Sequence, residues 1–390
     1  MIRKYALTLP LFLFFIESAI SNPVPGRVIE TDHIYNSEQI EVPADSLSKM
    51  IGRMIMIGFR GMSLEESDHL VRDLTQYHLG GVILFDYDVP TKTPIRNIDS
   101  KEQVSTLIRE LNSATQTNLL IAIDQEGGRV ARLKETRGFF RGQSAEKIAK
   151  LSEVSPDSVL FEFQKQADQL KELGFNVNFA PVVDLNLNPE NPVIGMIERS
   201  YSADPEQVTR LAQLYLRTLE EAGLTGVLKH YPGHGSSMND SHLGVTDVTT
   251  TWDSIELEPY RNLIQSGDAK AIMSAHVYHA GLDSLYPGTL SPFVNKTLLR
   301  NELGFDGVLF SDDLQMGAIR DQFTLEETVM LALNSGIDVL VFGNNSVYDS
   351  EIVPKVHQLI EKAVLSGRIP IERIQESVSR VERLHTLMEN

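Results

Sequence analysis

The sequence predicts an α/β protein folded as a single-domain (β/α)8 barrel of the TIM type, and three observations support this. Eight short β-rich runs recur along the chain, and amphipathic stretches with helical periodicity separate them. Most of the runs are almost continuously apolar, as expected of parallel strands that are covered on both faces. Alternating strands and helices imply right-handed βαβ units. Eight such units favour a closed barrel over the main alternative, an open doubly wound sheet.

The predicted strands are spread over the chain after residue 50. In order they are MIMIGF (54–59), GGVILF (80–85), LLIAID (119–124), NVNFAPVVD (176–184), TGVLKH (225–230), AKAIMSAH (269–276), DGVLFSDD (306–313) and GIDVLVFG (336–343). The clearest predicted helices cover 100–114, 155–175, 206–224, 347–367 and 370–389. One barrel accounts for these elements, so no second folded domain is expected.

The start of the chain has the pattern of a secretory signal. Two basic residues are followed by an apolar run, and Ala19-Ile20-Ser21 has the small-x-small pattern of a cleavage site. The apolar run is short for a membrane span, which favours a cleaved signal over an uncleaved anchor. We therefore expect a signal peptide at 1–21, a Pro-rich linker at 22–44, a catalytic domain at 45–390, and export to the periplasm or the extracellular space.

The charge composition of the chain argues against some classes of binding partner. The net charge is −18 and no basic run occurs, which argues against a nucleic-acid partner and against binding to an anionic membrane surface. After removal of the signal, no membrane insertion is expected. The chain has no cysteine, so it forms no disulfide, although an oxidising compartment would permit one.

Polar residues gather at the ends of five predicted strands, where barrel enzymes build their active sites. They are Asp124, Asp184, Lys229 with His230, Ser274 with His276, and Asp312 with Asp313. A single residue of this kind is explained as a helix cap or a satisfied core group, but repetition at the same end of the barrel indicates a site. Because neighbouring strand residues point to opposite sides, only one of Asp312 and Asp313 is expected to face the pocket.

The segment KHYPGHGSSMNDSHLG (229–244) places three histidines, a lysine and an aspartate in one loop. The loop could hold a metal ion, transfer protons or form a polar surface turn. His230, His234, Asp240 and His242 offer metal ligands, but they lack the HxH and HExxH spacings and all come from one loop. We therefore expect neither a metal ion nor a cofactor.

The order Asp240-Ser241-His242 favours proton transfer. A carboxylate two residues from an imidazole can accept its Nδ1–H, fix the tautomer and stabilise the imidazolium. His242 could then donate and recover a proton near neutral pH. The loop lacks a nucleophile, which Asp312 on the seventh predicted strand could supply.

The same loop resembles the KH(F/Y)PGHG-x4-DSH signature of bacterial β-N-acetylhexosaminidases of glycoside hydrolase family 3, the NagZ type. AIDQEGGRVARL, NPVIGMIERSYSADP and GFDGVLFSDDLQMGAI resemble the family's other blocks in the family's order. The resemblance implies a retaining exo-β-N-acetylglucosaminidase that forms a covalent glycosyl-aspartate and needs no cofactor. Its implied partner is an N-acetylglucosamine-containing glycan, either a peptidoglycan fragment or a chitooligosaccharide.

The resemblance also implies roles for individual residues. Asp312 would be the nucleophile and His242 the acid/base, assisted by Asp240, while His234 would serve the structure of the loop. Sugar hydroxyls would be held by Asp124, Arg132, Arg199, Lys229 and His230. Two features depart from the family. The second strand ends in LFDYDVP, where relatives often carry a basic residue, so the distal subsite is expected to differ. The export signal is also unlike cytoplasmic members that recycle cell-wall fragments.

The chemistry leaves alternatives open. Retaining hydrolysis needs a carboxylate that attacks the anomeric carbon and a second group that protonates the departing oxygen. That second group is usually a carboxylic acid with a raised pKa, and here a histidine would replace it. A neutral imidazole does not repel anions, so phosphorolysis stays open, as do a family 3 β-glycosidase with another sugar preference, a metal-dependent barrel hydrolase and an inert sugar-binding protein. The presence of Asp312, His242 and Asp240 together counts against the last.

Overall fold

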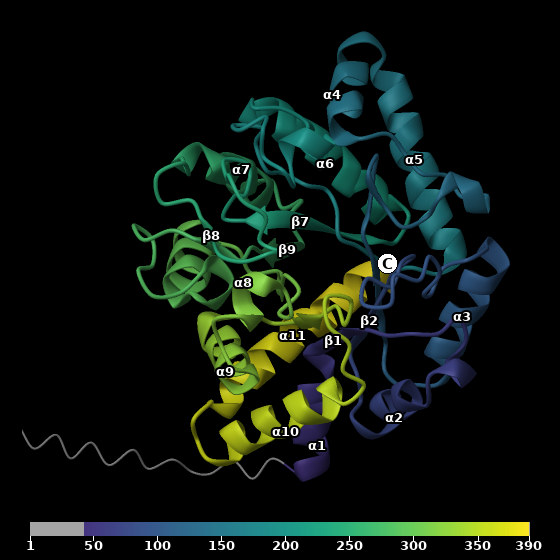
Figure 1. Ribbon diagram of the computed structural model, residues 1–390, viewed down its shortest axis with the longest axis vertical. Helices are drawn as coiled ribbons and strands as arrows, with labels where there is room; N and C mark the ends of the chain where they lie inside the picture. The colour runs from purple at the N-terminus through teal and green to yellow at the C-terminus, as the bar shows by residue number, and fades with distance from the viewer. Residues whose placement is uncertain (1–42, 390) are drawn as a thin grey trace, which may run out of the picture. The chain divides into compact units, whose positions relative to one another are not determined.

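The computed structural model describes residues 43–389, and at their centre lies an eight-stranded parallel sheet with helices around it (Figure 1). The strands follow the order β11-β9-β7-β6-β3-β2-β1-β12. Each of them overlaps one of the predicted runs. They are β1 (Ile55–Gly58), β2 (Gly81–Leu84), β3 (Leu120–Ile123), β6 (Val177–Asn178), β7 (Thr225–Tyr231), β9 (Ala271–Ser274), β11 (Val308–Ser311) and β12 (Leu340–Phe342).

Contacts between the first and last strands of this order close the sheet into a barrel. Phe310 of β11 forms a parallel bridge with Val339, next to β12. The amide of Ser311 donates to the Val339 carbonyl at 3.0 Å, and the amide of Val341 donates to the Ser311 hydroxyl at 2.9 Å. The predicted (β/α)8 barrel is therefore confirmed, and the open sheet is excluded.

Alternating side chains divide the apolar core into two layers. Met56, Leu120 and Phe310 point into the barrel and belong to its inner cluster, whereas their neighbours Ile55 and Ile57 pack outward against the helices. Val381 and Leu384 of the C-terminal helix α11 (Ile371–Glu389) also pack against the inner cluster. The barrel is thus filled with side chains, and α11 covers the end opposite the carboxyl ends of the strands.

Three of the α-helices begin at a side-chain cap. Ser100 and Asp204 each accept a hydrogen bond from a first-turn amide, and Thr324 forms a capping box with Glu327. The helices are α1 (Ala44–Arg53), α2 (Asp68–Gln76), α3 (Lys101–Ser113), α4 (Ala145–Val154), α5 (Pro156–Leu173), α6 (Pro205–Glu221), α7 (Glu258–Gln265), α8 (Gly317–Arg320), α9 (Leu325–Ser335), α10 (Ile352–Leu365) and α11, with a further helical segment at Phe293–Glu302. The five predicted helices correspond to α3, α5, α6, α10 and α11.

The fourth strand is shorter than predicted. The run 176–184 reads as one strand, but β6 covers only Val177 and Asn178, and pairing resumes at a single bridge between Val182 and Lys229. Pro181 lies between these two pairings and has no N–H to donate to a neighbouring strand, which interrupts the ladder.

Two predictions concern residues that the structure does not describe. The predicted signal peptide and nearly all of the predicted linker lie outside residues 43–389. Within the described residues, every helix is too short or too polar to span a lipid bilayer.

Candidate active site

The carboxyl ends of the strands bring the predicted sugar-binding residues together. Lys229 on β7 reaches Asp124, which follows β3, with 2.8 Å between Nζ and Oδ1. Arg132 donates from Nη2 to the other oxygen of Asp124 at 3.1 Å. Burial alone would raise the pKa of Asp124, but the charges of Lys229 and Arg132 hold it well below its usual range. Asp124 therefore stays ionised.

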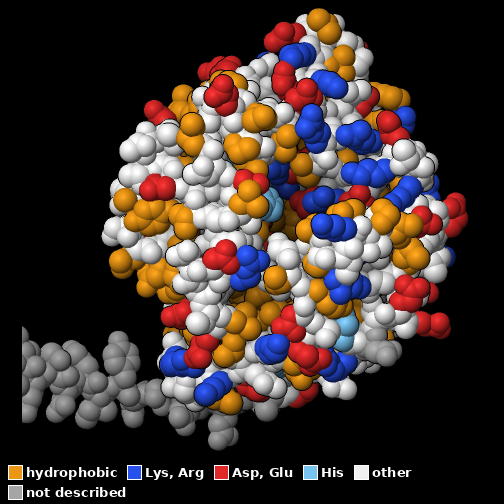
Figure 2. All heavy atoms as spheres, viewed as in Figure 1, with side chains coloured by type: hydrophobic (Ala, Val, Ile, Leu, Met, Phe, Trp, Pro, Cys, Tyr) orange, Lys and Arg blue, Asp and Glu red, His pale blue; other side chains and the backbone are white. Residues whose placement is uncertain are grey.

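Seen along the direction of Figure 1, the surface is hollowed near its centre, where charged side chains and a histidine gather (Figure 2).

Arg199 and His230 complete this network through two further carboxylates. Arg199 makes a bidentate pair with Glu126, at 2.8 Å from Nε and 2.7 Å from Nη2. Lys229 also contacts Glu126 at 2.7 Å. Nη2 of Arg199 lies 3.2 Å from Nε2 of His230, whose Nδ1 lies 2.6 Å from Asp184. Burial opposes ionisation of Glu126, but Arg199 and Lys229 outweigh it and lower its pKa.

Sequence reasoning missed the role of Glu126. It lies in β4 (Gln125–Gly127), which forms a hairpin with β5 (Val130–Ala131) directly after β3. The signal was available, since Glu126 comes two residues after Asp124 in DQEGG, and alternate residues of an extended chain share a side. Glu126 bridges Lys229 and Arg199, so it fixes two residues that the prediction did include.

Asp184 was identified as a strand-end residue but was given no role. Its carboxylate accepts hydrogen bonds from the amides of His230 and His234 and from Nδ1 of His230. The side chain is fully buried, and burial alone would raise its pKa, but His230 and His234 lower the pKa below its usual value. Asp184 thereby orients the His230 ring and anchors the start of the following loop.

One donor of this network has no partner. Nε of Arg132 is buried, and among the described residues it makes no hydrogen bond. The Arg132 guanidinium also lies 5.4 Å from the ring centre of Phe85. A buried unpaired donor is costly, and native structures rarely retain one unless it has a use.

Asp312 and Asp313 follow β11 and make different contacts. One oxygen of Asp312 accepts from the Asp313 amide at 2.8 Å, and the other has no hydrogen bond within residues 43–389. Asp313 instead accepts from the amides of Gln315 and Gly343, at 3.0 and 2.8 Å. It therefore ties the turn after β11 to the end of β12. β11 ends at Ser311, so strand alternation does not apply to these two residues. Even so, their environments differ: Asp313 is hydrogen-bonded to the amides of the turn and of β12's end, whereas one oxygen of Asp312 has no hydrogen bond within residues 43–389.

The pKa values of the two carboxyl groups shift in opposite directions. Burial favours the neutral form of both. At Asp312 the nearby imidazoles of His276, His230 and His242 outweigh burial and lower the pKa. At Asp313 burial prevails over two amide hydrogen bonds and raises the pKa to about 6. Asp312 is the one that is held as an anion.

His242 and Asp240 form the predicted pair. Nδ1 of His242 lies 2.7 Å from Oδ1 of Asp240, which also accepts from the His242 amide at 2.8 Å. Desolvation lowers the pKa of His242, but the bond to Asp240 and the charge of Asp312 outweigh it, so the pKa lies above its ordinary value. Because Nδ1–H is committed to Asp240, Nε2 is the nitrogen that can exchange a proton. The His242 side chain is 58% exposed, so solvent and ligands reach it.

The interior of the same loop is fastened by His234 and Glu256. His234 is buried between the hydroxyls of Ser237 and Ser241, and burial lowers its pKa to about 4. Glu256 accepts from the Gly235 amide at 2.9 Å and from the Ser236 hydroxyl at 2.5 Å, and burial raises its pKa to about 8. Neutral groups therefore hold the fold of this loop.

The loop rests on the helix that follows Asp312. The amides of Gly317 and Ala318, the first two residues of α8, donate to the carbonyls of His242 and Ser241 at 3.3 and 3.2 Å. A Cβ atom on Gly317 would lie 2.9 Å from the His242 carbonyl oxygen. The close contact between the loop and α8 therefore requires glycine at position 317. The same contact places His242 on the side of the site that carries Asp312.

The four histidine-loop residues considered as metal ligands have separate partners. His230 pairs with Asp184, His234 with two serines, and His242 with Asp240. Across residues 43–389, no group of three or more His, Cys, Asp or Glu side chains has an arrangement suited to a metal ion.

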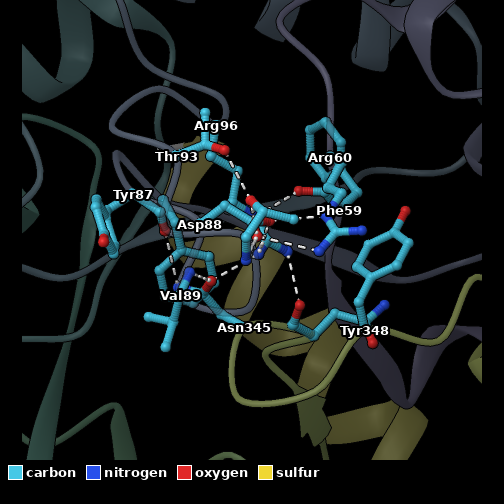
Figure 3. Close-up of polar contacts among 12 residues, drawn as sticks. Phe59, Arg60, Tyr87, Asp88, Val89, Thr93, Arg96, Asn345 and Tyr348 are labelled. Atoms are coloured by element: carbon cyan, nitrogen blue, oxygen red, sulfur yellow. Dashed lines mark hydrogen bonds and ion pairs between the residues drawn. The ribbon is translucent and has the colours of Figure 1, made fainter.

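The segment after β2 folds over the ends of β1, β2 and β12 (Figure 3). Asp88 accepts from Arg60 at 2.7 and 3.0 Å and from Arg96 at 3.0 Å. Arg96 is buried, and it also donates to the Phe59 carbonyl at 2.8 Å and the Asn344 carbonyl at 3.0 Å. Arg96 thus fixes the segment to the barrel rim. The expected difference in a distal subsite remains a prediction.

Comparisons with known proteins agree with this geometry. The family model "Glycosyl hydrolase family 3 N terminal domain" matches residues 46–384. The chain is 32% identical over 378 residues to Beta-hexosaminidase A of Pseudoalteromonas piscicida, covering 87% of this chain and 61% of the relative. It is 37% identical over 307 residues to Beta-hexosaminidase of Tolumonas auensis, covering 75% of this chain and 83% of the relative.

A solved structure is also similar to this chain. It is a glycoside hydrolase family 3 beta-N-acetylglucosaminidase from a Paenibacillus species, with a TM-score of 0.79 and 34% sequence identity. The match covers 88% of this chain and 62% of that protein. The chain therefore spans less than two thirds of the length of two of these three relatives.

Proposed function

Because the chain belongs to glycosyl hydrolase family 3, we propose that it is a retaining exo-β-N-acetylhexosaminidase. Its substrates would be peptidoglycan fragments or chitooligosaccharides that end in β-linked N-acetylglucosamine. The observation that carries the proposal is the combination of an anionic carboxylate, Asp312, with an imidazole, His242, whose Nδ1 is held by Asp240. The names of the relatives support the choice of sugar.

In the first step, a carboxylate oxygen of Asp312 attacks the anomeric carbon while the bond to the departing oxygen breaks. Nε2–H of His242 gives its proton to that oxygen. The lowered pKa of Asp312 and the raised pKa of His242 favour the two protonation states that this step needs. The products are a neutral glycosyl ester on Asp312 and a neutral imidazole whose Nδ1–H still faces Asp240.

In the second step, a water molecule attacks the same carbon from the side that the leaving group has vacated. Nε2 of His242 accepts a proton from the water, and the ester bond to Asp312 breaks. The carboxylate and the imidazolium are restored, and two inversions give overall retention of configuration. One imidazole thus serves as the acid and then as the base.

The charged network offers a binding surface for sugar hydroxyls. Carboxylate oxygens of Asp124 accept from hydroxyl groups, and Lys229 and Arg132 donate to them. Since Lys229 is buried and Asp124 is held ionised, a substrate that lacks a matching hydroxyl would leave a polar group of this network unpaired, which is costly. Recognition by this network would favour a terminal sugar with its hydroxyls free.

A panel of aryl β-glycosides tests the proposal. Purified protein is assayed on N-acetyl-β-glucosaminide and on the matching β-glucoside, each with and without phosphate. Faster release from the N-acetyl glycoside, with the free sugar as product, is expected. Faster release from the glucoside would replace the sugar assignment, and a sugar phosphate as product would replace hydrolysis with phosphorolysis.

Removal of metal ions tests the alternative of a metal-dependent hydrolase. We expect full activity after exhaustive chelation, because the loop histidines are committed to Asp184, Asp240 and serine hydroxyls. The assay compares chelated and untreated protein on the same aryl glycoside. Loss of activity that one equivalent of a divalent metal restores would favour the metal-dependent alternative.

We also propose that the protein is exported, on the strength of its first residues. Cleavage after Ser21 would give a mature chain that begins at Asn22. N-terminal sequencing of the protein from a secreting host measures this directly. A cytoplasmic protein that keeps Met1 would contradict export.

A further inference from the structure

His276 lies beside Asp312 but has no part in the mechanism above. It follows β9, the strand next to β11, and its side chain is 1% exposed. Nε2 lies 2.9 Å from the carbonyl oxygen of Asp313, and Nδ1 lies 2.8 Å from the hydroxyl of Thr289. Both ring nitrogens are therefore engaged, and one of them contacts the residue after the nucleophile.

These contacts continue to the other side of Asp312. The Thr289 hydroxyl lies 3.0 Å from the carbonyl oxygen of Ser274, and that oxygen accepts the amide of Asp312 at 3.1 Å. Hydrogen bonds thus link the amide of Asp312, through Ser274, Thr289 and His276, to the carbonyl of Asp313. We propose that His276 is a positioning residue that holds the backbone around Asp312 for attack on the anomeric carbon; this inference rests on the proposed function.

The protonation state of His276 follows from its neighbours. A carbonyl oxygen only accepts, so Nε2 carries the proton that is donated to Asp313. Burial is the largest influence on the pKa of His276 and lowers it, against the opposing charge of Asp312. The lowered pKa favours the neutral ring, in which Nδ1 is an acceptor, so the single proton of the Thr289 hydroxyl goes either to Nδ1 or to the Ser274 carbonyl. The two hydrogen bonds of the ring are directional and form without a net charge on it.

The fold has little need of these two hydrogen bonds. The carbonyl of Asp313 also accepts the Met316 amide at 2.9 Å, and the Thr289 hydroxyl keeps the Ser274 carbonyl as a partner. Replacing His276 by a ring of similar size would therefore leave neither partner without a bond. A purely structural role predicts almost no change in activity, whereas a positioning role predicts a large one.

The reason for a large effect is the geometry of Asp312. Its carboxylate is held by the amide of Asp313, so a rotation of this backbone displaces the attacking oxygen. A displacement of about 1 Å is enough to cost roughly 10²-fold in rate. The proposed sugar-binding residues Asp124 and Lys229 follow β3 and lie on β7, respectively, rather than on β9 or β11, so substrate affinity should change little.

The experiment compares three variants with the wild-type protein. His276→Phe fills the space without hydrogen bonds, and His276→Gln restores a donor. His279→Phe is the matched control, because within residues 43–389 the His279 ring accepts hydrogen bonds from the amides of Gly281 and Leu282 and packs against Trp252, so it contacts neither Asp312 nor Asp313. For each we measure kcat, KM, the melting temperature, and the rate at which a fluorinated N-acetylglucosaminyl fluoride labels Asp312.

We expect His276→Phe to lower kcat and the labelling rate by about 10²-fold, with KM within a few-fold of the wild-type value. His276→Gln should recover most of the loss, and His279→Phe should behave as wild type. An unchanged labelling rate in His276→Phe, a rise in KM alone, or a loss proportional to the unfolded fraction would overturn the inference. If wild-type protein cleaves no β-glycoside, the proposed function fails; if it is active and the variants match it, the inference alone fails.

Discussion

The two ends of the barrel both bury charged side chains, but they use them differently. At the end covered by α11, the fully buried carboxylate of Asp338 accepts from Arg300 at 2.7 Å, from Ser377 at 2.7 Å and from Arg380 at 3.3 Å. At the other end, Asp124 and Glu126 surround Lys229. The presence of buried charges therefore does not distinguish the α11 end of the barrel from the end that carries the proposed active site.

The difference lies in how completely the groups are satisfied. At the α11 end, Arg373 donates to the carbonyls of Leu333 and Ile337 at 3.0 and 2.6 Å, and Arg300 donates to those of Phe305 and Gly307 at 3.1 and 2.6 Å. These guanidinium groups fasten helices and loops to the barrel. Their hydrogen bonds are used within the protein itself.

At the carboxyl ends of the strands, three groups of the proposed catalytic and sugar-binding residues keep unused hydrogen-bonding capacity. Considering only residues 43–389, Nε of Arg132, Nε2 of His242 and one oxygen of Asp312 have no hydrogen-bond partner. A polar group at such a position that has no hydrogen-bond partner in the protein is available to bind a ligand. The comparison teaches that the buried arginines at the α11 end are bonded within the protein, whereas charged and imidazole groups of the proposed site keep hydrogen-bonding capacity for a ligand.

The largest expected effect comes from Asp312→Asn. Removal of the nucleophile should lower kcat by roughly 10⁴- to 10⁶-fold on every substrate, because no other group can form the ester. The melting temperature should stay close to that of the wild type, since within residues 43–389 the Asp312 side chain has a hydrogen bond with the Asp313 amide alone. Peptide mass spectrometry of fluoro-sugar-labelled wild-type protein checks the assignment, and an adduct on Asp313 would contradict it.

His242→Ala should have the next largest effect, and its size should depend on the leaving group. General acid assistance is worth about 10²–10⁴-fold for a sugar leaving group, and far less for a nitrophenolate that departs without a proton. Activity of the wild type should also fall as pH rises through the pKa of His242, which lies above its ordinary value. Pre-steady-state release from both substrates measures this, and equal losses on the two would argue against the acid role.

Asp338→Ala should affect the other end of the barrel. The substitution leaves Arg300, Arg373 and Arg380 without their shared carboxylate, and breaking a buried pair typically costs about 3–5 kcal/mol. We expect the free energy of unfolding in urea to fall by that amount while kcat per folded molecule stays the same. A loss of kcat in fully folded protein would show that the two ends are not independent.

Glu256→Gln should have a smaller effect that depends on pH. Glu256 lies at the active end but has no cationic partner among the described residues, and its pKa of about 8 exceeds the ordinary 4.5. Between these values the folded protein holds a proton that the unfolded chain releases, so stability falls as pH rises, by up to about 1.4 kcal/mol per pH unit.

Glutamine imitates the protonated carboxyl group, so Glu256→Gln should lose this pH dependence and gain stability over the wild type as pH rises from 5 to 8. Urea midpoints at three pH values in this range provide the measurement. Parallel curves for the two proteins would mean that Glu256 is ionised throughout.

Much of the fold was predictable because it depends on local patterns. Apolar runs and helical periodicity are properties of neighbouring residues, and all eight strands of the sheet overlap their predicted runs. The family resemblance of the loop 229–244 is confirmed as well. The short β6 shows the limit, since Pro181 interrupted a run that looked continuous.

The site was less predictable because it depends on contacts between distant segments. The Asp240–His242 pair is local, and the sequence indicated it directly. Glu126 pairs with Arg199, which lies 73 residues away, so its role follows only from the folded barrel. The peptide bond between Lys229 and His230 is cis, a conformation that no sequence pattern predicted.

The contact between the loop and α8 has a consequence for protein engineering. The backbone of Ser241 and His242 contacts Gly317 and Ala318, a few residues beyond Asp312, so the proposed proton donor and the proposed nucleophile are held by the same turn and short helix. Grafting the histidine loop alone onto another barrel would transfer these side chains without the helix that supports their backbone. The smallest transplantable module of this chemistry is therefore a pair of segments, the loop and the turn that leads into α8, moved together.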